Sequence, residues 1–163
     1  MRQWRTLERI AEFVEATPQF SGMILLGSLA KGVGDAVSDI DLLIVAPDNG
    51  FTEAWARRND LHRTGALAVW DGRHTDFPEA AAHVWLTEDL IVVEALIATP
   101  RSGARLAEPA VVLLGPTDLG RTFPNRLPVS RAEMSLGNDP VERAYEVLKQ
   151  AIRGRKLAKT NIS

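Results

Sequence analysis

The sequence predicts an α/β or α+β domain, with a mixed β-sheet of about four or five strands flanked by helices. Short apolar runs alternate with amphipathic segments, and clusters of Gly, Pro and Asp separate them. The chain has 163 residues, 45% of them hydrophobic, which is enough to bury one compact core. We therefore expect a main domain in residues 1–120. Residues 121–163 are expected to form an irregular crossing segment and a C-terminal helix packed on that same domain.

The opening segment predicts an amphipathic helix. Its apolar residues recur at steps of three and four, and charged residues occupy most of the positions between them. Thr17-Pro18 ends the segment. The apolar positions are Trp4, Leu7, Ala11 and Val14.

Two strands and a second helix are expected next. Met23–Leu26 and Ser38–Ala46 are short apolar runs, typical of strands that are covered on both faces, and a glycine-rich turn joins them. Thr52 is a candidate N-cap for a helix that carries Trp55 and Leu61.

A pair of neighbouring strands is predicted in the middle of the chain. Ala66–Trp70 and Ala80–Leu86 are the extended segments, and the turn signals Asp71-Gly72 and Phe77-Pro78 lie between them.

The last elements are a helix, a strand and a C-terminal helix. Thr87-Glu88-Asp89 offers a capping residue and two acids, which favours a helix over Leu90–Ala98. Ala110–Leu114 is a strand candidate, and Asp139-Pro140 begins the final helix.

Composition and charge exclude several function classes. The 19 Lys and Arg against 21 Asp and Glu give a net charge of −2, so nucleic acid is not an expected partner. The absence of cysteine excludes disulfides, thiolate metal sites and a cysteine nucleophile, and favours a cytoplasmic protein. The longest apolar runs fall well short of the roughly 20 residues of a membrane span, so no membrane association is expected.

Asp39 and Asp41 are the candidate metal ligands. Residues i and i+2 of a strand point to the same face, about 6.6 Å apart, so both carboxylates can hold one cation. Two like charges on an otherwise apolar strand are unfavourable unless a cation lies between them. Mg²⁺ binds one or two carboxylates and completes its shell with phosphates and water. The alternative is a surface strand whose two acids are solvated.

Gly27-Ser28, at the end of the first predicted strand, is a candidate phosphate-binding turn. Glycine permits close approach of the backbone, and serine offers a hydroxyl and an N–H group. Lys31 is a candidate for a positive charge toward the same phosphates, although its side chain could equally face water.

The pair Gly27-Ser28, followed after ten intervening residues by Asp39-Ile40-Asp41, resembles the nucleotidyltransferase superfamily related to DNA polymerase β. The spacing is similar to that of the minimal and antibiotic-modifying members. The resemblance covers about residues 23–45. It implies that Ser28, with Gly27, contacts nucleotide phosphates and that Asp39 and Asp41 bind Mg²⁺.

Members of that family usually carry a third carboxylate on a later strand, which acts as a base or as a metal ligand. The predicted strand Ala80–Leu86 contains no acid. His83 is therefore the candidate base, because an imidazole can accept a proton near neutral pH. Asp71 is an alternative, and Glu94 is another if Leu90–Ala98 is a strand.

The resemblance implies a Mg²⁺-dependent nucleotidyltransferase. We expect it to move an NMP, AMP in the first instance, from an NTP such as ATP to a hydroxyl of a small molecule or a partner protein. The alternative is a degenerate binding or antitoxin module that lacks the third carboxylate. At 163 residues there is little room for a separate acceptor-binding domain, so a homodimer or a partner protein is expected to complete the cleft.

Overall fold

The computed structural model describes residues 2–36, 38–63, 65–74, 77–106 and 109–123, together with Ala144, Val147 and Ala151. The chain divides into two compact units, residues 1–128 and 129–163. All helices and strands with described bounds belong to the first unit.

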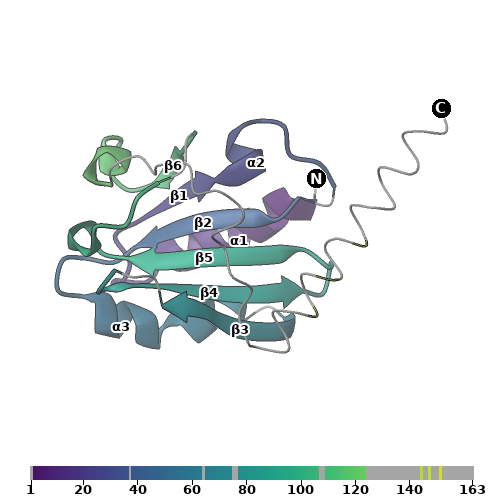
Figure 1. Cartoon of the computed structure of the whole chain (residues 1–163), viewed down its shortest axis with the longest axis horizontal. Coiled ribbons are helices and arrows are strands. Elements are labelled where there is room, and N and C mark those ends of the chain that lie inside the picture. Colours follow the sequence, from purple (N-terminus) through teal and green to yellow (C-terminus); the bar gives the residue numbers. More distant parts are fainter. Residues whose placement is uncertain are drawn as a thin grey trace. The chain divides into compact units, whose positions relative to one another are not determined.

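The described strands form one mixed sheet of six, in the order β3-β4-β5-β2-β1-β6 (Figure 1). β2 and β5 run parallel, and every other neighbouring pair is antiparallel. The predicted fold class is confirmed, with six strands in place of four or five. The strands are β1 (Gly22–Leu26), β2 (Ile40–Val45), β3 (Ala66–His74), β4 (Ala80–Thr87), β5 (Val92–Ala98) and β6 (Val111–Leu114).

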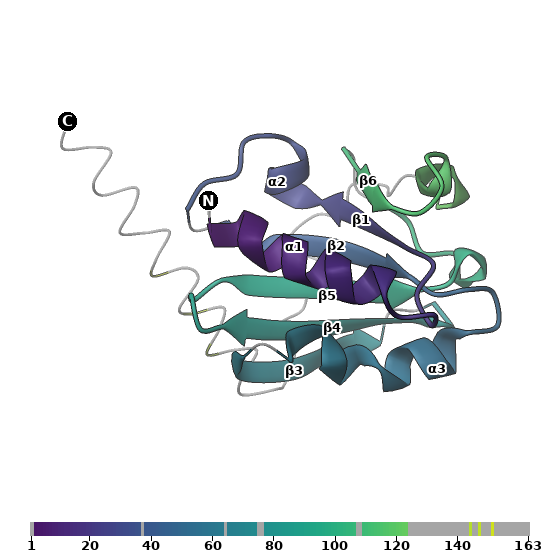
Figure 2. The same ribbon diagram turned by 180° about the vertical axis from the view of Figure 1, so that it is seen from behind.

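Helix α1 (Arg2–Glu15) covers one face of the sheet (Figure 2). The short helix α3 (Phe51–Ala56) and the 3-10 helix η1 (Arg58–His62) lie on this face too. Their apolar side chains share one core with alternate residues of β2 and β5, because alternate residues of a strand point to the same face. This core includes Leu7, Ile10, Val14, Ile40, Leu42, Ile44, Ala54, Leu61, Val93, Ala95 and Ile97.

The buried stripe of α1 is rotated from the predicted one. Trp4, expected in the core, is 46% exposed, whereas Gln3 is only 1% exposed. Ile10, not Ala11, completes the stripe. The observed steps follow the 3.6-residue period of a helix as closely as the predicted ones do, so periodicity alone does not choose between them.

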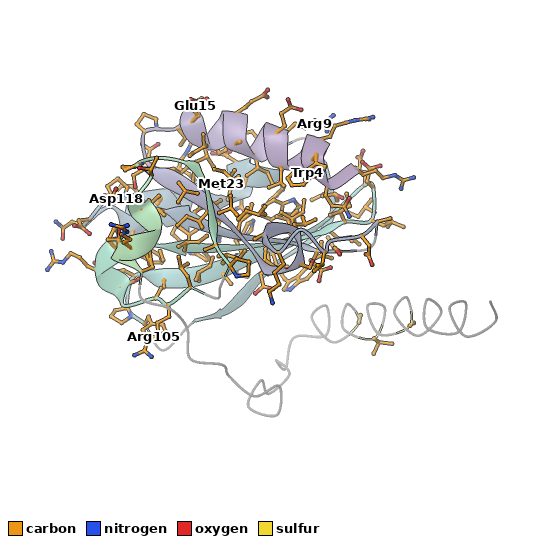
Figure 3. The ribbon with its side chains drawn as sticks, turned by 90° about the horizontal axis from the view of Figure 1, so that it is seen from above. Trp4, Arg9, Glu15, Met23, Arg105 and Asp118 are labelled. Atoms are coloured by element: carbon orange, nitrogen blue, oxygen red, sulfur yellow. The ribbon has the colours of Figure 1, made fainter. Side chains whose placement is uncertain are left out.

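A second core covers part of the opposite face of the sheet. Figure 3 shows α1, marked by Trp4 and Glu15, on one side and Arg105, in the segment that follows β5, on the other. Apolar residues of this segment and of the segment after β6 pack on β1, β2 and β5. They are Ala104, Leu106, Leu119 and Phe123, packed with Ile24, Leu43, Val45 and Ala98.

The predicted helix over Leu90–Ala98 is wrong, because Val92–Ala98 forms strand β5. Thr87 and the acids after it make a tight turn between β4 and β5, in which Thr87 N donates to Ile91 O at 2.9 Å. Leu90 has a φ of 58°, which interrupts helical geometry. Pairing with β4 and β2 on both sides outweighs the local capping signal.

Two smaller predictions are also corrected. Asp71-Gly72, expected as a turn, lies inside β3, which pairs with β4 as far as His74. Thr52 lies within α3, and the N-cap position is Gly50. The strand predicted at Ala110–Leu114 is confirmed as β6.

The C-terminal prediction falls mostly outside the described residues. Of the expected final helix, Ala144, Val147 and Ala151 are helical and exposed. The crossing segment from residue 124 onward and the docking of that helix lie outside the described part of the chain. Among the described helices, none combines the length and the apolar character that crossing a bilayer requires.

Candidate active site

The turn from β1 into helix α2 (Gly27–Ala30) lies against Asp41 of β2. β1 and β2 pair so that Leu26 is opposite Asp41, which places Gly27 beside that carboxylate. A Cβ added at Gly27 would overlap Asp41 Oδ2 and lie 2.9 Å from Asp41 Cγ. Gly27 also has a φ of +66°, which residues with a side chain rarely adopt. Glycine is therefore required both by the backbone and by the neighbouring carboxylate.

Glu94 of β5 stands beside Asp41. The two strands are parallel, and Asp41 and Glu94 are register partners, so their Cα atoms are separated by about one interstrand spacing of 4.8 Å. The core under α1 contains the residues directly before and after Asp41 and Glu94 in their strands. Neither Asp41 nor Glu94 belongs to that core. Asp41 and Glu94 therefore share the face opposite α1. Glu94 is exposed although the residues on both sides of it are buried.

Asp39 lies just before β2, two residues from Asp41, and is half-buried. Asp39 is separated from Asp41 only by Ile40, the first residue of β2. Ser28 is half-buried in the first turn of α2, whereas Lys31, at the end of α2, is exposed.

The donor chemistry of this cluster fits Mg²⁺ bound together with a phosphate ligand. The acids are oxygen donors, which Mg²⁺ prefers. Within the described residues, no three His, Cys, Asp or Glu side chains form a set that could hold an ion by themselves. Mg²⁺ sites typically use one or two carboxylates and take the remaining ligands from substrate phosphates and water. Asp39 and Asp41 are the residues that would hold it.

His83, predicted as the base, lies on the other face of the sheet. Val84 of β4 is the register partner of Glu94, whereas His83 pairs with Ala95, a residue of the core under α1. Register partners point to the same face, so His83 points away from Glu94 and Asp41. Asp71, the alternative acid, pairs with His83 and shares its face. The geometry separates both residues from the acid cluster.

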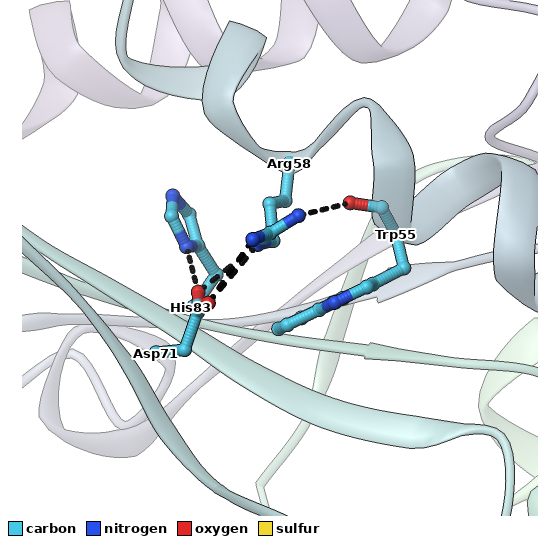
Figure 4. A network of polar contacts seen from close by, with 4 residues as sticks. All are labelled: Trp55, Arg58, Asp71 and His83. Carbon is cyan, nitrogen blue, oxygen red and sulfur yellow. Dashed lines mark hydrogen bonds and ion pairs between the residues drawn. The ribbon is translucent and has the colours of Figure 1, made fainter.

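His83 is instead part of a polar network under η1, which extends from the buried His83 to the partly exposed Asp71 (Figure 4). His83 is fully buried, and its Nδ1 donates to Asp71 Oδ1 at 2.8 Å. Arg58 Nε also donates to Asp71 Oδ1, at 3.1 Å, and its guanidinium carbon lies 4.6 Å from the centre of the Trp55 ring. The His62 ring stacks on His83 with 5.3 Å between centroids. Asp71 therefore holds the ring of His83 through Nδ1, whereas the buried Nε2 of His83 has no hydrogen-bond partner among the described residues.

Burial decides the protonation of this network. It lowers the pKa of His83, and the hydrogen bond that His83 donates to Asp71, which acts in the other direction, does not cancel the effect. Burial also lowers the pKa of His62. For Asp71 burial acts to raise the pKa, but hydrogen bonds from Arg58 and His83 outweigh it, so the pKa of Asp71 lies below its usual range.

The stability of the protein is expected to fall as the pH drops below about 6.5, the pKa of an unfolded histidine. Above that pH, His83 is neutral in both states; below it, the unfolded chain binds a proton that the folded chain resists, so unfolding is favoured. Asp71 remains ionised through this range and does not contribute. Urea unfolding at pH 7.5, 6.5 and 5.5 measures the decline.

His62→Phe is the comparison for this measurement. It removes a second histidine with a lowered pKa and also the repulsion that lowers the pKa of His83, so the decline should become shallower. Equal or greater stability of the wild type at pH 5.5 than at pH 7.5 would contradict the expectation.

A cavity of about 340 Å³ lies on the α1 side of the sheet and not at the acid cluster. Its lining comes from α1, η1 and the β4–β5 turn, and includes Arg9, Phe13, Asp60, Trp85 and Glu88. None of the predicted site residues lines this cavity.

Glu94 is only a secondary candidate from the sequence, because the capping signals before it predict a helix over Leu90–Ala98. The signal that favours a strand is present in Ile91-Val92-Val93 and Ile97, since β-branched residues are enriched in strands. Because β5 pairs with β2, Glu94 is the register partner of Asp41.

Comparison with protein families gives one match. A family model described as "Nucleotidyltransferase domain" matches residues 7–98. The matched range begins in α1 and ends with β5, so it contains Gly27, Ser28, Asp39, Asp41 and Glu94. In a comparison with curated proteins, none matched the chain.

Proposed function

The chain belongs to the nucleotidyltransferase domain family, and from this membership we propose that it transfers an NMP group from an NTP to a hydroxyl of an acceptor. ATP is the proposed donor and AMP the transferred group. The proposed acceptor is a hydroxylated small molecule or a protein side chain. A second copy of the chain or a partner protein is proposed to complete the acceptor cleft.

Each residue of the acid cluster has a proposed role. Gly27 and Ser28 bind the phosphates, because glycine lets the β1–α2 turn lie directly against Asp41, next to the proposed metal ligands. Asp39 and Asp41 bind Mg²⁺ with the NTP. When bound, Mg²⁺ supplies positive charge that offsets the charge developing on the phosphate oxygens.

Glu94 is the proposed base. It takes the proton of the acceptor hydroxyl as that oxygen attacks the α-phosphorus; the bond from the α-phosphorus to the bridging oxygen breaks, and pyrophosphate leaves. Glu94 is exposed, so an acceptor can reach it, and it stands one strand from Asp41. His83 is not proposed for this role because it lies on the opposite face.

The register between β2 and β5 is the observation that carries this proposal. It places Glu94 beside Asp41 on the face where Gly27 also approaches Asp41. The binding-only alternative was based on the lack of a third carboxylate, and Glu94 removes that reason.

Labelled ATP tests the proposed reaction directly. The protein is incubated with Mg²⁺, candidate acceptors, and ATP labelled at either the α or the γ phosphate. NMP transfer moves the α label to the acceptor and releases the γ label in pyrophosphate. Transfer of the γ label to the acceptor would indicate a kinase reaction instead. The absence of any thermal stabilisation by ATP with Mg²⁺ would contradict nucleotide binding itself.

Glu94→Gln is expected to lower kcat by a factor of about 10²–10⁴, the usual contribution of a positioned base. Nucleotide affinity should change little, because Glu94 is not proposed to bind the phosphates. Initial rates of α-label transfer and calorimetric titration with ATP and Mg²⁺ measure the two effects.

Glu88→Gln is the matched control for this variant. Glu88 is exposed in the turn that leads into β5, so the same chemical change is made close by in the chain but away from Asp41. Its kcat should equal that of the wild type. An equal loss of kcat in Glu94→Gln and Glu88→Gln would show that Glu94 has no specific role in the reaction.

A further inference from the structure

Gln3 is a buried polar residue in the apolar stripe of α1. It is 1% exposed and takes the stripe position one turn before Leu7. A buried amide without hydrogen-bond partners is strongly unfavourable, so its presence requires partners.

The partners of Gln3 lie in the loop that leads to Asp39. Gln3 Nε2 donates to Asp35 O at 2.8 Å and to Ser38 O at 3.2 Å. Both acceptors are carbonyls, so only the amide nitrogen, with its two hydrogens, can satisfy them together. A single side chain of α1 thus fixes two points of a loop more than 30 residues away in the sequence.

Asp35 and Ser38 are the two ends of a closed turn. Ser38 N donates to Asp35 O at 3.1 Å, and Asp35 N donates to Ser38 Oγ at 2.8 Å. Gln3 adds a bond to the carbonyl at each end. The turn is therefore held from within and from α1.

The carbonyl of Ser38 and the N–H of Asp39 belong to one planar peptide group. A hydrogen bond that fixes this carbonyl also fixes the direction in which the chain enters Asp39. β2 begins only at Ile40, and its register with β1 begins at Asp41, so the sheet pairing does not include Asp39. The turn therefore contributes to the position of Asp39.

We propose that Gln3 is a positioning residue that holds the carboxylate of Asp39 at the distance from Asp41 needed to bind Mg²⁺ with the nucleotide. This inference rests on the proposed function of the two aspartates. Gln3 acts through the Asp35–Ser38 turn and is not assigned a contact with the metal or the nucleotide.

Gln3→Met tests the proposal, since methionine has a similar length and no amide. The probe is α,β-methylene ATP with Mg²⁺, titrated by calorimetry, and α-label transfer is measured over a range of Mg²⁺ concentrations. Loss of a residue that orients a metal ligand typically lowers metal affinity about 10–100-fold. We expect weaker binding of the probe by that factor, a higher Mg²⁺ concentration for half-maximal transfer, and recovery of transfer at high Mg²⁺.

Leu7→Ala controls for general damage to α1. Leu7 is buried on the same stripe, so this variant weakens the docking of the helix without touching the turn. Its melting temperature should fall at least as far as that of Gln3→Met, while its Mg²⁺ requirement stays that of the wild type. Ser38→Ala provides a second route, because it removes the side-chain bonds inside the turn and leaves α1 intact.

The outcomes separate the two proposals. Wild-type binding of the probe together with an unchanged Mg²⁺ requirement in Gln3→Met and Ser38→Ala overturns the role of Gln3 alone. An equal change in Leu7→Ala overturns it as well, because the effect would then come from helix docking. If the wild type does not bind the probe with Mg²⁺, the proposed function fails and the role of Gln3 fails with it.

Discussion

Asp41→Asn is expected to reduce NMP transfer by about 10³-fold or more, since a carboxylate that holds a catalytic cation contributes several kcal/mol and each 1.36 kcal/mol is a factor of ten. Asp41 stands at the centre of the acid cluster, with Gly27 on one side and Glu94 on the other. Asparagine keeps the size of the side chain and removes its charge, so the fold should persist. The rate of α-label transfer and the melting temperature of the variant measure the two properties.

Asp48→Asn makes the same chemical change in the exposed turn that follows the other end of β2. This variant should keep wild-type activity. ATP with Mg²⁺ should no longer stabilise Asp41→Asn against thermal unfolding, but should still stabilise Asp48→Asn. That result would assign the loss of nucleotide binding to the proposed site. An active Asp41→Asn enzyme would exclude Asp41 as a metal ligand.

Gly27→Ala is expected to lower the transfer rate by at least about 10²-fold, the scale of loss when reacting groups are displaced by about 1 Å. The added Cβ would overlap Asp41 Oδ2, so either the carboxylate or the β1–α2 turn must move. Both belong to the proposed site, and either movement should disturb the proposed binding of phosphates beside Asp41. The strained φ adds a stability loss of about 1–2 kcal/mol.

Gly32→Ala separates the effect of backbone strain from the effect of the contact with Asp41. Gly32 has a φ of +70°, nearly the same as that of Gly27, but a Cβ there would meet nothing within 4 Å. It should therefore show only the loss of stability that comes from the backbone strain and retain the transfer rate. If both variants lose activity equally, backbone strain in the β1–α2 region is responsible and the contact between Gly27 and Asp41 is not.

The core of the site could be predicted because its signals are local in the sequence. Gly27-Ser28 ends an apolar run, and Asp39 and Asp41 are two residues apart at the start of another. The structure confirms both runs as strands and pairs them so that Gly27 meets Asp41. Short apolar runs separated by a glycine-rich turn leave few other ways to fold, because neighbouring strands in the chain commonly pair.

The third carboxylate could not be located in the same way. The segment that contains Glu94 carries capping signals of a helix and branched residues of a strand, and these local preferences compete. The outcome is decided by β2 and β4, which lie on either side of β5 and pair with it along its whole length. Those contacts join residues about 50 positions apart for β2, so no window of sequence around Glu94 contains them.

The sequence by itself determined the fold class, the first two strands and the acid pair with its glycine turn, since each depends on the spacing of a few neighbouring residues. The tertiary structure decided which face of the sheet each polar residue occupies. Alternation along β4 shows that His83 and Trp85 share a face, but only the packing of α1 and η1 makes that face the interior. The same packing buries Gln3 and leaves Glu94 exposed beside Asp41, because α1 and η1 cover only the face of the sheet opposite to Glu94.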